Sequence, residues 1–183
     1  MKLPNTWEDY TSQYLEIAEN LIKHNPIDTD LIIPTMYIAR HYIELRTKMI
    51  AKIATVISGG QAQDVQGHNL KTLWTKSSNL IIEMLKKNSL YTPNIQIQLQ
   101  AIEKFIEKRT NWDSNSMALR YPFDLDGVAY DLSENIPLFI KEWNNCTDAL
   151  EYIYKQLTTD IHKGTIPLTD NQKDSLRNNG III

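Results

Sequence analysis

The sequence predicts an all-α fold: an antiparallel bundle of about five helices, with a short extended or hairpin segment before the last helix. Apolar residues recur at helical spacing through most of the 183 residues. The breaks between these stretches are short and rich in Pro, Gly or Asn, and short connections favour antiparallel neighbours. The length fits one domain. We place that domain at residues 1–160 and expect residues 161–183 to be a polar, loosely ordered tail.

The first two helices are predicted at residues 7–24 and 33–58. Thr6 and Asp9 have the spacing of a capping box at the start of the first helix. The second helix ends at Gly59-Gly60, as expected of a C-terminal glycine. Its apolar residues form one continuous stripe, made of Ile38, Tyr42, Leu45, Met49, Ile53 and Val56.

The remaining helices are predicted at residues 69–87, 93–111 and 133–157. Asn69 is a suitable N-cap for the third helix, and Thr92 caps the fourth, which opens with proline. The last helix carries a stripe with steps of four and three residues: Phe139, Trp143, Cys146, Leu150, Ile153 and Leu157.

The helical pattern stops in the stretch MALRYPFDLDGVAYDL, residues 117–132. Asp126-Gly127 is a turn signal that could close a short hairpin. The chain then ends in Ile181-Ile182-Ile183. Three exposed β-branched residues in a row normally pack on another part of the protein.

The composition is that of an ordinary globular protein, with 42% apolar and 22% charged residues. With a net charge of −3, any contact with nucleic acid would require a local basic patch. The single cysteine, Cys146, excludes an internal disulfide framework and a Cys-rich zinc site, and it suits a reducing cytoplasm. We find no signal peptide and no membrane-spanning run, so we expect a cytoplasmic location away from the membrane.

Three polar residues of the second helix lie close together on its surface. His41, Glu44 and Lys48 fall within roughly 60° of one another at 100° per residue, beside the apolar stripe. They are either a polar site at a helix–helix seam or a surface Glu–Lys pair, which would contribute only a few tenths of a kcal/mol.

His68 lies at a helix start, in GHNLKTLW. A helix N-terminus disfavours a protonated imidazole, so His68 either caps and packs as a neutral ring or acts as an acid–base group. The four histidines lack paired HxxxH spacing, and the phosphate-loop, GxGxxG and GxSxG motifs are absent. We therefore expect no metal and no cofactor.

Arg120-Tyr121-Pro122 forms the third polar feature. Proline fixes its own φ and keeps Tyr121 extended, which aims the neighbouring side chains reproducibly. The Arg120 guanidinium suits a phosphate or a carboxylate, and Tyr121 could stack on a base. Alternatively, Arg120 braces the bundle, and we predict that it lies within ion-pair reach of Glu44.

The order of these elements resembles the HEPN family of prokaryotic helical domains, over about residues 33 to 157. The resembling stretches are IARHYIELRTKMIAK, GHNLKTLW, LRYPFD and the last long helix. Glu44 and Lys48 match the Glu and nearby Lys of that family. His68-Asn69-Leu70 matches its short His-Asp-Leu-like element, and Arg120-Tyr121-Pro122 matches its Arg-Tyr-Pro element.

The resemblance implies a helical bundle that dimerises and acts in a toxin–antitoxin or phage-defence system. The nuclease branch of the family uses Arg, four to six residues, then His, and no arginine of this chain has a histidine at that distance. We therefore expect a non-catalytic binding or oligomerisation module that forms a homodimer or binds a partner protein. The alternative is an RNA-directed nuclease or nucleotide-binding protein with a non-standard site at Arg120, His68 and Glu44, in which His68 and Arg120 are the catalytic candidates.

Overall fold

The computed structural model describes residues 4–24, 31–62, 65–109 and 135–181. These residues form the helices α1 (Trp7–His24), α2 (Ile32–Ile57), α3 (Leu70–Lys87), α4 (Pro93–Arg109), α5 (Ile136–His162) and α6 (Asp170–Asn178). The predicted all-α bundle is thereby confirmed, and no strand occurs within the described ranges. The predicted extended or hairpin segment, residues 117–132, lies outside them.

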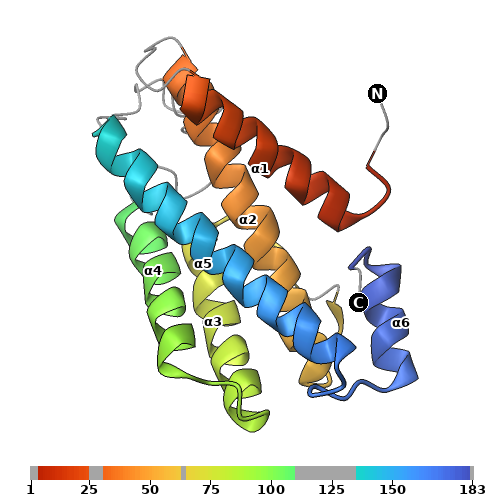
Figure 1. The fold of residues 1–183 in the computed structure, drawn as a ribbon. Coiled ribbons are helices and arrows are strands. Elements are labelled where there is room, and N and C mark those ends of the chain that lie inside the picture. Colours follow the sequence, from red (N-terminus) through yellow and green to blue (C-terminus); the bar gives the residue numbers. More distant parts are fainter. Residues whose placement is uncertain (1–3, 25–30, 63–64, 110–134, 182–183) are drawn as a thin grey trace.

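Helix α2 is the central element of the bundle (Figure 1). Helices α1, α3, α5 and α6 pack against it, whereas α4 packs against α5 and α3. The reason is that α2 is apolar around most of its circumference, not only along the predicted stripe. Further buried residues on its other sides are Met36, Ala39, Ile43, Ile50 and Ala54. A helix that is apolar on most sides is stable only when it is enclosed, so a charged side chain that is buried on α2 needs a partner inside the bundle.

The predicted N-caps of three helices are present. Asn69 accepts the N–H of Thr72 at 2.8 Å at the start of α3. Thr6 Oγ1 and Thr92 Oγ1 accept backbone N–H groups three residues further on, at 3.0 and 3.3 Å. Each bond satisfies one N–H that has no partner within its helix, which fixes where the helix begins.

Helix α5 begins and ends later than the sequence predicts. Its N-cap is Asn135, whose side chain accepts the N–H of Leu138 at 2.9 Å, and a proline follows in the first turn. All six residues of its predicted stripe are buried. One of them, Trp143, also donates its indole N–H to the carbonyl of Ala39 on α2 at 3.2 Å. The two longest helices are therefore joined by both packing and a buried hydrogen bond.

The C-terminal region differs from the loosely ordered tail that the sequence predicts. Helix α6 opens with a capping box between Thr169 and Gln172, and Gln172 Nε2 donates to the carbonyl of Val56 at 2.8 Å. Leu176 and Ile181 are almost completely buried. Leu176 is the only apolar residue of α6, so a search for recurring apolar residues does not find this helix. The packing of Ile181 agrees with the expectation that the terminal isoleucines cover another part of the chain.

Candidate functional site

A buried carboxylate on α2 forms the centre of a polar cluster. Glu44 is only 1% exposed. Its Oε1 accepts hydrogen bonds from Lys48 Nζ at 2.7 Å and from His68 Nδ1 at 2.9 Å, and its Oε2 accepts one from Arg40 Nη1 at 3.0 Å. Charge-assisted bonds of this kind offset the cost of removing a carboxylate from water. Arg40, Glu44, Lys48 and His68 are called the Glu44 cluster below.

His68 is held in place by two groups of α2. Arg40 Nη2 donates to the His68 carbonyl at 2.7 Å, while the ring binds Glu44. Because a carboxylate only accepts, Nδ1 is the nitrogen that carries the proton. The side chain is nevertheless 67% exposed. Asn69, and not His68, caps α3, so the sequence-based role of His68 as a cap is taken by its neighbour.

The Glu44 cluster carries net positive charge at neutral pH. Burial raises the pKa of Glu44, but the hydrogen bonds and charges of Lys48, His68 and Arg40 outweigh it, so that the pKa lies below 4.5. Glu44 is thus an anion that contacts two cations, Arg40 and Lys48. With its oxygens occupied by three donors, it serves to position its neighbours.

His41 lies beside this cluster but packs on aromatic rings instead. Its ring centroid is 4.6 Å from that of Tyr14, edge-on, and 5.9 Å from that of Tyr37, stacked. Burial lowers the pKa of His41 below 6.5; the attraction of Glu44 opposes this shift, and the positive charges of Arg40 and Lys48 add to it. His41 is therefore a neutral packing residue at the seam between α1 and α2.

The His41→Phe variant is expected to lose part of the decline in stability that the wild type shows as the pH falls below 6.5. Since the folded pKa of His41 is lowered, the unfolded chain binds its proton first on acidification. The contribution of His41 is therefore present above pH 6.5 and is lost as the pH falls through its folded pKa. Phenylalanine keeps the aromatic contacts and cannot titrate. Denaturant melts at several pH values would measure the effect, and identical pH profiles for the wild type and the variant would contradict it.

Arg120 and Tyr121 lie outside the described residues, so the ion pair between Arg120 and Glu44 stays a prediction. Within the described part of the chain, Arg40 supplies the guanidinium that binds Glu44. Arg40 is not among the site residues predicted from the sequence. The signal was available, because Arg40 and Glu44 are four residues apart on one helix and Arg40 falls beside His41 and Glu44 on the same surface.

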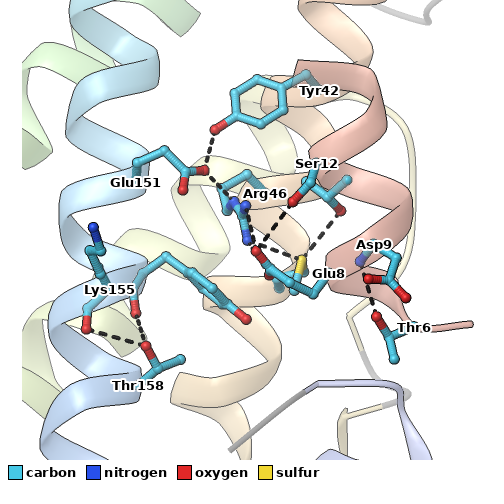
Figure 2. Close-up of polar contacts among 12 residues, drawn as sticks. Thr6, Glu8, Asp9, Ser12, Tyr42, Arg46, Glu151, Lys155 and Thr158 are labelled. Atoms are coloured by element: carbon cyan, nitrogen blue, oxygen red, sulfur yellow. Dashed lines mark hydrogen bonds and ion pairs between the residues drawn. The ribbon is translucent and has the colours of Figure 1, made fainter. Parts of the chain in front are cut away.

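A second buried ion-pair network, not anticipated from the sequence, joins three helices (Figure 2). Arg46 of α2 is 1% exposed. Its Nη1 lies 2.7 Å from Glu8 Oε2 on α1, and its Nε lies 2.6 Å from Glu151 Oε1 on α5. The second contact is a close ion pair without good hydrogen-bond direction. The Tyr42 hydroxyl donates to the same Glu151 oxygen, and the Arg46 guanidinium lies 4.2 Å from the centroid of the Tyr154 ring.

The sequence position of Arg46 indicates that its side chain could be buried. Arg46 follows Tyr42 by four residues and precedes Met49 by three, which places a charge within the apolar stripe of α2. Burial raises the pKa of Glu8, but the hydrogen bond and charge of Arg46 outweigh it and bring that pKa below 4.5. Because Arg46 binds both carboxylates, we interpret the network as a connection between α1, α2 and α5.

Two other kinds of site were considered among the described residues: a reactive cysteine and a metal centre. Cys146 is completely buried, and burial strongly raises the pKa of its thiol, which makes it a poor nucleophile. In the ranges that the structure describes, no three His, Cys, Asp or Glu side chains gather to hold a metal ion.

Two hollows flank the segment Val65–His68. Their volumes are about 300 and 290 Å³. The larger lies toward α3, and the smaller lies between that segment, α2 and the start of α1. His68 borders both, so the Glu44 cluster places its imidazole at the rim of two cavities.

No protein-family model, curated protein or solved structure matches this chain. None of the helices in the described ranges combines the length and the apolar character needed to cross a membrane.

Proposed function

We propose that this chain is a HEPN-like binding or oligomerisation module, without catalytic activity of its own, in a prokaryotic defence or toxin–antitoxin type system. The observation that carries the proposal is the state of Glu44, which is buried and engaged by Lys48, His68 and Arg40 at 2.7 to 3.0 Å. A general base needs an oxygen within reach of a substrate proton, and Glu44 presents none at the surface.

The same cluster supports the resemblance to the HEPN family. The resemblance pairs Glu44 and Lys48 of one helix with the element His68-Asn69-Leu70. These separate stretches meet in a single cluster around the buried Glu44, which fixes the start of α3 against α2. A fixed, exposed imidazole is suited to recognition because it offers a donor and an acceptor on a rigid base. The binding partner in this proposal is a second copy of the chain or another protein, with RNA or a nucleotide as a further ligand.

A second candidate function is an RNA-directed nuclease with a non-standard site. One observation favours it: the 2.9 Å bond from His68 Nδ1 to Glu44 sets the tautomer in which Nε2 is the basic nitrogen. A carboxylate-oriented histidine is a common general base. In this candidate, Arg120 would bind the phosphate.

The first proposal predicts that the purified chain does not cleave total RNA and behaves as an oligomer. Gel analysis of RNA incubated with the wild type and with His68→Ala should show the same intact RNA. Light scattering after gel filtration should give twice the chain mass of 21.2 kDa.

His162→Ala is the matched control because His162 is an exposed histidine at the end of α5. Cleavage by the wild type and by His162→Ala, but not by His68→Ala, would overturn the non-catalytic proposal in favour of the nuclease. A monomeric wild type would contradict the homodimer.

A further inference from the structure

The smaller hollow beside His68 has the features of a ligand site. It lies where the start of α1, the middle of α2 and the segment before α3 meet. The residues that line it are Trp7, Lys48, Met49, Lys52, Val65, Gln66, Gly67 and His68. Its volume of about 290 Å³ is at the lower end of the range for small-molecule pockets, about 300 to 1,000 Å³. A ligand of mononucleotide size is therefore appropriate.

Two lysines of α2, Lys48 and Lys52, bring positive charge to this hollow, and among the described residues only Lys48 has a carboxylate partner. Lys52 Nζ lies 5.0 Å from the centroid of the Trp7 ring and 3.5 Å from Asn179 Oδ1. Within the described part of the chain, no carboxylate is in ion-pair distance of Lys52. Lys48 binds Glu44, which also binds Arg40. Burial and then the nearby Lys48 lower the pKa of Lys52, so an anion placed beside both amines would relieve an existing repulsion.

The neighbouring hollow extends this positive region. It is lined on the far side of Val65–His68 by Lys76 of α3, and no acidic side chain is among the described residues lining either hollow. The chain as a whole carries a net charge of −3. Lys48, Lys52 and Lys76 thus gather here against the overall charge, and among the described residues only Lys48 has a carboxylate partner, Glu44. They form the local basic patch that contact with a nucleic acid or nucleotide requires.

Trp7 adds an aromatic surface to the charged one. The indole is 37% exposed. It is held in position by an edge-on contact with Tyr10, with ring centroids 6.0 Å apart, and by its backbone N–H, which donates to the Gly180 carbonyl at 3.1 Å. In proteins that bind single-stranded nucleic acids, bases stack on exposed aromatic side chains while nearby cationic side chains neutralise the phosphates. Trp7 and the neighbouring lysines provide both features.

We propose that this hollow binds a nucleoside phosphate, either free or at the end of an RNA strand. Lys52 and Lys48 neutralise the phosphate, and Trp7 stacks on the base. The inference rests on the proposed function insofar as it gives the binding module a ligand. It requires no catalysis and no particular oligomeric state.

Calorimetric titration of the full chain with AMP tests this inference, and Lys52→Gln is the informative variant. Lys52 makes no ion pair in the described structure, so its replacement should leave the fold intact. We expect AMP to bind the wild type, more weakly as salt is raised, and Lys52→Gln to weaken binding about tenfold. Lys86→Gln is the matched control, because Lys86 also lies over an aromatic ring, 5.2 Å from the Tyr91 centroid, but lines neither hollow.

Two further ligands identify the chemistry and its source. Inorganic phosphate should bind more weakly than AMP, and Trp7→Leu should reduce this difference. A 5′-phosphorylated RNA pentamer that binds more tightly than AMP would identify an RNA end as the source, whereas equal affinity would identify the free nucleotide. Equal affinity for AMP and inorganic phosphate, no binding of AMP at millimolar concentration, or unchanged binding in Lys52→Gln would each overturn the inference.

Light scattering on the same samples separates this inference from the proposed function. A dimeric wild type that binds no AMP would overturn the nucleotide site alone. A monomer that binds AMP through Lys52 would contradict the homodimer and leave the site supported.

Discussion

Replacement of Glu44 by glutamine is expected to reduce the free energy of unfolding at pH 7 by about 3 kcal/mol. The variant keeps the size of the side chain and removes a negative charge that contacts both Arg40 and Lys48. The side chains of these two cations are only 6% and 14% exposed, so water cannot take the place of the carboxylate. Denaturant unfolding would measure the loss. Glu103→Gln, at an exposed position of α4, should change the free energy by no more than about 0.5 kcal/mol.

Glu44→Gln should also change how the free energy of unfolding depends on pH. Because the folded pKa of Glu44 lies below 4.5, its contribution is complete above pH 4.5 and is lost as the pH falls through the folded pKa. Glu44→Gln lacks this contribution, so its stability should decline less steeply on acidification. Adding Lys48→Met, which removes one of the two cations that Glu44 contacts, should restore part of the stability. A loss below about 0.5 kcal/mol in Glu44→Gln would mean that the cluster is solvated and does not brace α2 against His68.

Arg46→Met is expected to cost about 2 to 3 kcal/mol. Methionine retains much of the volume of the arginine stem but loses both ion pairs, to Glu8 and to Glu151, and the contact with the Tyr154 ring. The side chains of the two carboxylates are 28% and 36% exposed, so water can recover part of their hydration. The expected loss is therefore smaller than for Glu44.

Arg46→Lys provides a graded comparison for this network. A lysine keeps the charge but lacks the planar fork that binds two carboxylates on different helices, so it should recover less than half of the lost free energy. Arg177→Met is the surface control, because its ion pair with Asp174 spans 3.5 Å between side chains that are 58% and 66% exposed. Equal stability of Arg46→Met and Arg177→Met would contradict a structural role for Arg46.

Most of the fold could be predicted from the sequence because most of its helices are amphipathic and capped. Asn69, Thr6 and Thr92 mark helix starts with their own side chains, and a local signal of this kind is visible without tertiary structure. Helix α6 could not be predicted in this way. Leu176 is its only buried residue, and one apolar position shows no helical period. The packing of α6 beside α2 is visible only in the folded structure.

The candidate site could be predicted only in part, because spacing along one helix does not identify partners on other helices. Spacing on one helix placed Glu44 and Lys48 together, and the structure agrees. It also suggested His41 as a member of the cluster, because angular position on a helix does not distinguish a ring that packs on Tyr14 from one that binds a carboxylate. The contacts of Arg46 with α1 and α5 join residues far apart in the chain, and no pattern within one sequence specifies such partners.

The contact between Trp7 and Gly180 has a consequence for the order in which the protein assembles. Gly180 has a positive φ of +67°, and a Cβ there would lie 2.9 Å from Trp7 Cδ1, so the segment after α6 passes close against the first turn of α1. During synthesis, α1 and α2 leave the ribosome well before Gly180 is added. The position of Trp7 beside Lys52 can therefore be fixed only after Gly180 has been synthesised, and a shorter nascent chain would present the lysines without this aromatic side of the hollow.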